Sequence, residues 1–211
     1  MTELVRMESV MHESFHSLDK KKQSRIINAA MTVFSQIPYS KASTDDIAAM
    51  AEISKGSLFY HFHNKKDLYC YLYEYSCKKI YEKIDENRAM EETDFFERNA
   101  KIVEARVCTM IEYPCIFDFA LRAYYETDHT VEEDIKAINR KILIDANIKL
   151  YENIDTSKFK HKEDIGKAIK MLVWIGEGFI KERMVEGTLN LDQIQAEVYD
   201  YLEIMKQGFY K

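Results

Sequence analysis

Glycine and proline are scarce in this chain, which holds six glycines and two prolines among its 211 residues. Together they make up about 4 % of the sequence, where average usage is roughly 12 %. All-β and α/β folds need frequent turns, and these two residues mark most of them. The scarcity therefore predicts an all-helical (all-α) fold.

Cysteine is also limited, to two pairs with a spacing of seven residues, Cys70/Cys77 and Cys108/Cys115. In a continuous helix, that spacing separates the two Cα atoms by about 10.5 Å. A disulfide requires less than about 7 Å. We predict that all four are free and behave as small buried hydrophobic residues, since a redox role would need partners from different helices.

Long apolar runs are missing as well. No segment approaches the roughly 18 apolar residues of a membrane span, and residues 1–18 lack the apolar core and cleavage site of a secretory signal. The sequence shows no phosphate-binding loop, no dinucleotide-binding glycine motif and no G-x-S-x-G element. We expect a cytoplasmic protein that does not bind membranes, is not an enzyme and carries no cofactor.

The net charge of −6 is unevenly distributed. Residues 1–66 hold nine Lys and Arg against seven Asp and Glu, whereas residues 67–211 hold 21 against 29. A mildly basic segment on an acidic body is compatible with a local DNA-binding surface.

Apolar residues recur at helical spacing along most of the chain. Four helix starts are marked by residues whose side chains accept backbone N–H groups, at Asp19, at Ser43 or Thr44, at Ser54 and at Asn64. Pro38 ends the first of these helices. Longer helices are predicted over about 93–112, 115–126, 130–153, 162–186 and 191–208. We expect three parts: an N-terminal extension (1–18), a three-helix unit (19–66) and a larger helical domain (67–211).

Within the three-helix unit, two short helices joined by a tight turn predict a helix-turn-helix, whose second helix can enter the major groove of DNA. Leu58 and Phe62 lie four residues apart and anchor that helix, which leaves four polar or aromatic side chains facing outward: Lys55, Ser57, Tyr60 and His61. Gly56 permits a close backbone approach, and Lys65 can meet a phosphate. An ordinary helical hairpin with solvated polar residues would show the same pattern.

Three runs make the pattern more specific: Thr44-Asp-Asp-Ile-Ala, Ile53-Ser-Lys-Gly-Ser-Leu-Phe-Tyr-His-Phe and Asn64-Lys-Lys-Asp-Leu. Together they resemble the DNA-binding head of TetR-family transcriptional regulators, over roughly residues 22–70. The resemblance implies a homodimer that binds a palindromic operator in double-stranded DNA. It also implies a C-terminal helical domain for ligand binding and dimerisation, and a repressor that a small, largely apolar effector releases from DNA.

The resemblance also assigns roles to individual residues. Thr44 corresponds to the phosphate-contacting residue that caps the second helix, and Lys65 to a phosphate-binding lysine. The residues that enter the groove are Lys55, Gly56 and Ser57, while Tyr60 and His61 contact the DNA backbone and base edges. Three positions depart from the family pattern: Phe59 stands where a tyrosine is usual, and Pro38 and Glu52 stand where glycine is frequent.

The C-terminal domain is rich in aromatic residues, and we select Tyr113, Phe117, Arg122 and Trp174 as candidate ligand-binding residues. The last two long helices carry broad apolar stripes that include Phe179 and Leu202. Two glycines on the first of them, Gly176 and Gly178, permit close helix approach. These helices are therefore predicted to form the dimer interface.

One motif competes with this interpretation. His12-Glu-Ser-Phe-His16 matches H-E-x-x-H, the helical zinc motif of metallopeptidases. Such an enzyme needs a third ligand and a substrate-holding structure, and eleven residues before the motif supply neither, so we predict no metal site. The alternatives to a regulator are a helical small-molecule-binding or interaction protein without specific DNA binding, and a metalloenzyme.

Overall fold

A computed structural model describes residues 12–186 and 191–211. Within these ranges the protein is all-α, as predicted, with one isolated β-bridge between Phe159 and Tyr210 and no strand. The α-helices are α2 (Glu13–His16), α3 (Lys20–Gln36), α4 (Thr44–Met50), α5 (Lys55–His61), α6 (Lys65–Glu86), α7 (Phe95–Glu112), α8 (Ile116–Tyr124), α9 (Glu132–Ile138), α10 (Ile144–Tyr151), α11 (Ile165–Glu186) and α12 (Leu191–Phe209). No described helix is both long and apolar enough to cross a bilayer.

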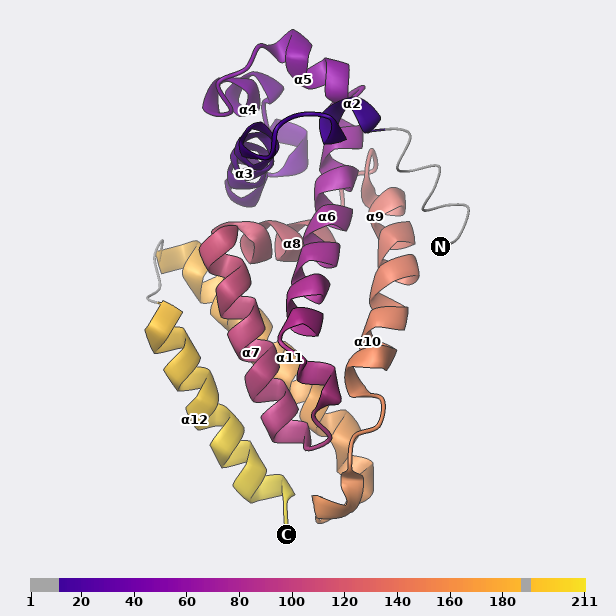
Figure 1. Ribbon diagram of the computed structural model, residues 1–211, viewed down its shortest axis with the longest axis vertical. Helices are drawn as coiled ribbons and strands as arrows, with labels where there is room; N and C mark the ends of the chain where they lie inside the picture. The colour runs from indigo at the N-terminus through magenta and orange to yellow at the C-terminus, as the bar shows by residue number, and fades with distance from the viewer. Residues whose placement is uncertain (1–11, 187–190) are drawn as a thin grey trace.

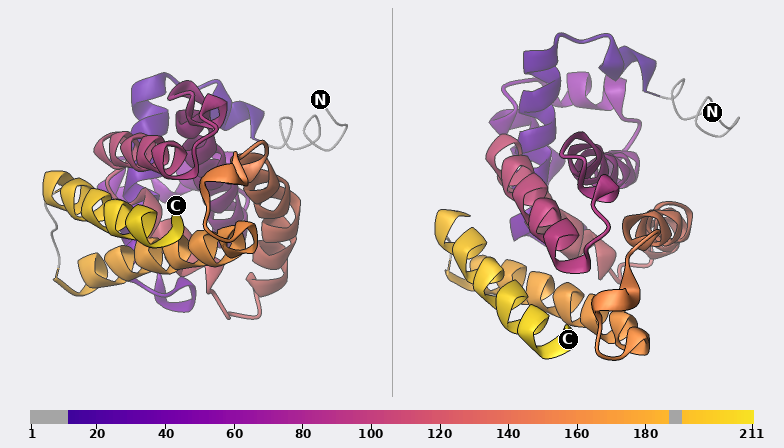
Figure 2. Two further views of the ribbon diagram at one scale, coloured as in Figure 1. Left: turned by 90° about the horizontal axis from the view of Figure 1, so that it is seen from below. Right: turned by 60° about the horizontal axis from the view of Figure 1, so that its bottom comes forward.

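The helices form two groups (Figure 1). The head consists of α2 to α5, and the body consists of α7 to α12. Helix α6 begins in the head and runs down into the body. In the two further views, α11 and α12 lie side by side along one side of the body (Figure 2). Helix α6 is therefore shared by the two groups.

Local capping explains where the head helices begin. Asp19 accepts a hydrogen bond from the backbone N–H of Lys22, and Ser54 accepts one from that of Ser57. Ser43 rather than Thr44 caps α4, since its hydroxyl accepts from two backbone N–H groups. Asn64 caps α6 in the same way. Each cap satisfies donors that have no partner inside the helix.

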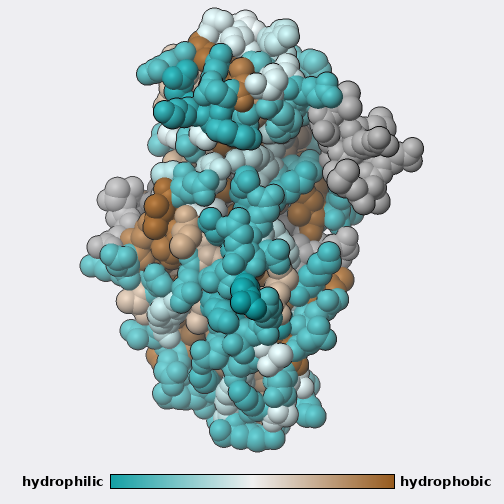
Figure 3. Space-filling view, in the orientation of Figure 1, coloured by the Kyte–Doolittle hydropathy of each residue, from teal (hydrophilic) through white to brown (hydrophobic). Residues whose placement is uncertain are grey.

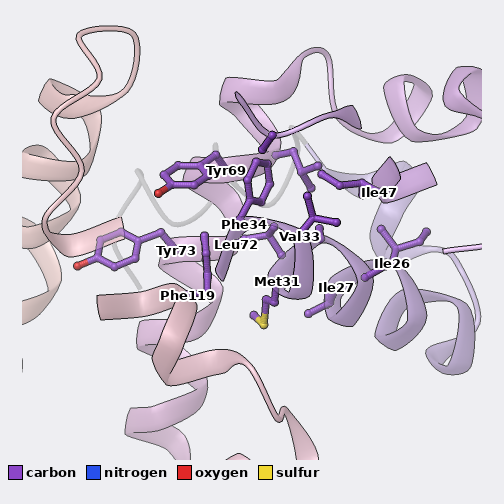
Figure 4. Packing of buried hydrophobic residues seen from close by; sticks show 14 of the residues in the cluster. Ile26, Ile27, Met31, Val33, Phe34, Ile47, Tyr69, Leu72, Tyr73 and Phe119 are labelled. Carbon is purple, nitrogen blue, oxygen red and sulfur yellow. The ribbon is translucent and has the colours of Figure 1, made fainter. Parts of the chain in front are cut away.

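The hydrophobic core does not stop at the head. Phe34 of α3 and Ile47 of α4 pack in the same cluster as Leu72 of α6 and Phe119 of α8 (Figure 4). Ile135 of α9 also belongs to it. One continuous core therefore joins α3 of the head to α6 and α8.

Several details differ from the sequence predictions. The helix predicted over about 130–153 is interrupted by a π-helical segment, Asn139–Leu143. Cys77 is buried and the other three cysteines are not, with Cys108 exposed because it lies on the outer face of α7. All four are free. Phe15, in the predicted N-terminal extension, is fully buried. Residues 1–11 of that extension, and Gly187 after α11, lie outside the described residues.

Candidate nucleic-acid interface and internal cavity

Helix α5 lies at the end of the head, with one face buried and the other facing solvent (Figure 1). Leu58 and Phe62 are buried, as predicted, and hold α5 against the core. On the other face, Lys55 and Gly56 are exposed, and Tyr60 is 72 % exposed. An exposed lysine, a glycine and an aromatic hydroxyl on one short helix can contact phosphates and base edges.

Two of the predicted contact residues have partners inside the head. His61 is buried, and its Nδ1 lies 3.1 Å from Oγ of Ser14. Lys65 donates from Nζ to the carbonyl oxygens of Tyr39 at 2.7 Å and Ala42 at 3.2 Å. Both side chains are therefore held by partners within the head, behind the exposed face of α5.

The remaining candidates lie at the edge of the α5 surface. Thr44 is the first residue of α4 and is half-buried, and Ser57 is half-buried within the first turn of α5. Lys55 forms an ion pair with Asp45 of α4, with 2.8 Å between Nζ and Oδ2. Both side chains are largely exposed, so the pair contributes at most about 1 kcal/mol and can be exchanged for a phosphate.

The H-E-x-x-H segment packs against the head. Phe15 contacts the rings of Phe62 and Tyr71, and Nε2 of His12 lies 3.2 Å from Oδ1 of Asp67. Burial raises the pKa of the Asp67 carboxyl, but the hydrogen bond with His12 and one from the backbone of His63 together hold it below its usual value. Among the described residues, no three metal-ligating side chains gather.

A cavity of about 590 Å³ lies inside the body. Its wall is formed by side chains of α6, α7, α8, α10, α11, α12 and the π-helical segment Asn139–Leu143, and most of them are apolar. This volume falls within the roughly 300–1,000 Å³ of small-molecule sites. The described body therefore has room for a ligand of that size.

Of the four predicted ligand-binding residues, only Phe117 lines this cavity. Tyr113 is buried elsewhere, with its hydroxyl 2.7 Å from that of Tyr75. Arg122 points toward the head, where its Nε donates to the carbonyl of Ser35 at 2.9 Å. Trp174 is 59 % exposed on the outside of α11. The structure places these three outside the cavity, because Arg122 and Trp174 lie on other faces of their helices and Tyr113 follows the end of α7.

Sequence reasoning missed the charged residues in the cavity wall, among them Arg106 of α7. The signal was present, since Arg106 lies four residues from both Ile102 and Met110, within the apolar stripe of α7. It also missed Tyr73 and Cys77 of α6, which line the cavity. Helix α6 therefore provides part of the cavity wall and, at its other end, follows directly after α5.

The comparisons with known proteins agree with this architecture. Residues 26–72, which include α4 and α5, match the family model described as bacterial regulatory proteins, tetR family. The biofilm operon icaADBC HTH-type negative transcriptional regulator IcaR of Staphylococcus aureus (strain Newman) is 29 % identical over 192 residues, which cover 86 % of this chain and 97 % of IcaR. These two matches support a TetR-family transcriptional regulator.

Solved structures of TetR-family proteins share the fold. A TetR-like regulator from Rhodococcus sp. RHA1 matches with a TM-score of 0.62 and 20 % identity over 90 % of this chain and 96 % of that one. FadR from Bacillus subtilis, solved in complex with stearoyl-CoA, matches with a TM-score of 0.58 and 18 % identity over 84 % and 96 % of the two chains. TetR-family proteins are non-enzymatic DNA-binding regulators, and the matches of this chain agree with that role.

One departure from the TetR pattern has a structural consequence. Glu52, at a position where the family often has glycine, has a φ of 52° in the turn between α4 and α5. This left-handed conformation is unfavourable for a residue with a Cβ atom. The side chain is held by Arg25, with 3.1 Å between NH1 and Oε2. The left-handed backbone of this turn explains why the family often has glycine at this position, where this chain accommodates a glutamate instead.

Proposed function

We propose that this protein is a transcriptional repressor that binds a palindromic operator as a homodimer and is released when a small, largely apolar molecule enters the body cavity. The observation that carries the proposal is the position of α6, which starts beside α5 and lines the cavity with Tyr73 and Cys77. Repression is supported by the relative IcaR, whose name describes a negative regulator.

The proposed DNA contacts are Lys55, Gly56, Ser57 and Tyr60 of α5, together with Thr44 at the start of α4. Lys55 and Tyr60 are the most accessible side chains of this set. His61 and Lys65, with their present partners, orient α5. In functional terms, residues 19–66 serve DNA binding and residues 67–211 serve effector binding and dimerisation. The described end of the N-terminal extension reinforces the DNA-binding part, because Phe15 packs in its core.

The proposed dimer interface lies on α11 and α12. Large apolar side chains are exposed on both helices: Met171, Val173, Trp174, Val185, Tyr201 and Ile204. The face in Figure 3 is mainly hydrophilic, with brown patches among the polar side chains. Leu202, by contrast, is buried and lines the cavity. Pairing these faces would shield apolar surface, which is unusual on a monomer, and would present two α5 helices to successive major grooves about 34–36 Å apart.

Two helices, α6 and α8, connect the cavity to the head. Helix α6 carries the wall residues Tyr73 and Cys77 and starts at the Asn64 cap, three residues after α5 ends. Helix α8 contributes Phe117 to the wall and binds the end of α3 through Arg122. A ligand that favours one arrangement of α6 and α8 changes the placement of α5. A typical coupling of about 1–3 kcal/mol corresponds to a change of about 5- to 150-fold in operator affinity.

The test is selection of bound sites from random DNA duplexes. We expect a two-fold symmetric site, and we expect Tyr60→Ala and Lys55→Ala to reduce the preference for that site while leaving the protein folded. Trp174→Glu combined with Ile204→Glu is expected to give monomers by light scattering and to abolish operator binding. Ile148→Glu, at an exposed apolar position on α10, serves as the matched control. A wild-type protein without preference for any selected site would refute the proposal.

A further inference from the structure

Two arginines on α7 occupy the apolar side of the helix but differ in their surroundings. Arg98 is fully buried, and four backbone carbonyls accept from its guanidinium: Glu92 at 2.6 Å, Leu150 and Glu152 at 2.8 Å, and Met90 at 3.3 Å. Its hydrogen-bonding capacity is used within the fold. These hydrogen bonds connect α7 to the end of α10, to the residue that follows α10 and to the segment that precedes α7.

Arg106, eight residues further along α7, is in the opposite situation. Its Nε atom is buried and has no hydrogen-bond partner in the part of the chain that the structure describes. Burial lowers the pKa of its guanidinium, because a charged group loses favourable interactions with water when it leaves solvent. The fold thus leaves a buried cationic donor unsatisfied, which is unfavourable unless a partner arrives.

The guanidinium of Arg106 is directed across the cavity. A Cβ atom built on Gly176 of α11 would lie 3.9 Å from NH1 of Arg106, so the side chain extends from α7 to α11. Around it, the wall includes the apolar side chains of Ile80, Val103 and Phe179. The charge therefore lies in a mostly apolar, partly open pocket that Arg140 also lines.

The acidic residue in the cavity wall has other partners. Oε1 of Glu177 accepts from the hydroxyl of Tyr125 at 2.9 Å, and Oε2 lies 3.5 Å from Nζ of Lys181. Asn99 donates to the carbonyl of Phe95 at 2.7 Å. Neither side chain supplies the missing partner of Arg106, so the site has a place for an external anion.

We infer that the cavity binds an amphipathic carboxylate, with the carboxylate paired to the guanidinium of Arg106 and the apolar body against the surrounding wall. A planar guanidinium matches a carboxylate with two parallel hydrogen bonds. The apolar part gains from leaving water. This inference rests on the proposed effector site and specifies the chemistry of its ligand.

The test compares alkyl carboxylates with uncharged ligands of equal length. Octanoate, decanoate and dodecanoate, and the corresponding alcohols, are titrated into the full-length protein by calorimetry. We expect each carboxylate to bind at least tenfold more tightly than its alcohol. In Arg106→Met, which keeps a long apolar side chain, this preference is expected to disappear while alcohol binding is retained. Equal binding of acid and alcohol to the wild type, or an unchanged preference in Arg106→Met, would overturn the inference.

Two further measurements separate this inference from the proposed function. Thermal melting of the ligand-free proteins checks folding, and Arg106→Met is expected to melt at or above the wild-type temperature because it removes an unsatisfied buried charge. Operator binding is measured with and without decanoate. If decanoate binds through Arg106 without changing operator affinity, the ligand inference stands and induction fails. If alcohols release the operator and carboxylates do not bind, induction stands and the ligand inference fails.

Discussion

In the head, α3, α4 and α5 each begin at a side chain that accepts a backbone N–H, whereas α8 and α9 in the body begin without a side-chain cap. Polar groups in the head also have hydrogen-bond partners nearby. The ammonium of Lys65, for example, donates to the carbonyl oxygens of Tyr39 and Ala42, which precede α4. The body contains a cavity, and among the residues that the structure describes Nε of Arg106 has no hydrogen-bond partner. Capping is thus more frequent in the head, although α2 lacks a cap and Asp94 caps α7 in the body. We therefore expect the two regions to respond differently to mutation.

The largest expected effect is in the body. Arg98→Met removes the donor to four carbonyls and leaves them buried, so we expect the free energy of unfolding to fall by about 3–5 kcal/mol. Urea denaturation followed by circular dichroism measures this change. The matched control is Arg106→Met, which we expect to be neutral or stabilising. Similar losses in the two variants would contradict the distinction between a satisfied and an unsatisfied arginine.

In the head, the expected effect of losing one cap is smaller. Ser54→Ala removes the acceptor for the backbone N–H of Ser57, 3.0 Å away, and should lower the free energy of unfolding by about 1 kcal/mol. Ser57→Ala, within the same turn, keeps the cap and should change it by no more than a few tenths. The same denaturation experiment measures both. A Ser54→Ala protein as stable as the wild type would show that packing, rather than capping, defines the start of α5.

A charge on the head surface should affect DNA binding more than stability. Asp45→Asn removes the carboxylate that pairs with Lys55 and so frees that ammonium for a phosphate. We expect tighter binding to all duplexes and a salt dependence steeper by about one unit. Asp46→Asn is the control, since Asp46 lies in the same first turn of α4 without pairing to Lys55. Equal gains in the two variants would assign the effect to net charge alone.

The smallest expected effect concerns pH. Burial lowers the pKa of His61 and of His16 from 6.5, so the folded head favours their neutral forms. As pH falls below about 6.5, the unfolded chain binds protons first and stability declines. The lowered pKa of Asp94, in the body, comes from hydrogen bonds with Lys158 and the backbone of Glu97 that outweigh the opposing effect of burial. The contribution of ionised Asp94 to folding stability is kept until pH falls below about 4.

Melting temperatures between pH 7.5 and 5 isolate the contribution of the head. His61→Asn should flatten the pH dependence, whereas His129→Asn, which replaces a fully exposed side chain, should leave it unchanged. If His61→Asn and the wild type lose stability in parallel over this range, the buried histidines are not the cause.

Much of the head could be predicted from the sequence because its signals are local. Ser54 and Asn64 cap α5 and α6 as expected, and Leu58 and Phe62 anchor α5. The cavity could not be predicted in the same way. Trp174, Arg122 and Tyr113 are the aromatic or basic residues that composition favours, yet each faces away from the cavity, toward solvent, the head or Tyr75. Which face of a long helix points inward depends on neighbours far away in the sequence.

The sequence by itself determined the all-α fold, the helix starts of the head and the residues of the TetR-like DNA-binding motif, because capping, turn composition and helical periodicity act over a few residues. It also placed both Arg98 and Arg106 among the apolar residues of α7. Only the tertiary structure decided that four carbonyls surround Arg98, while Arg106 extends into a cavity. The physical reason is that hydrogen-bond satisfaction of a buried charge is set by backbone groups from other helices, whose positions exist only in the assembled fold.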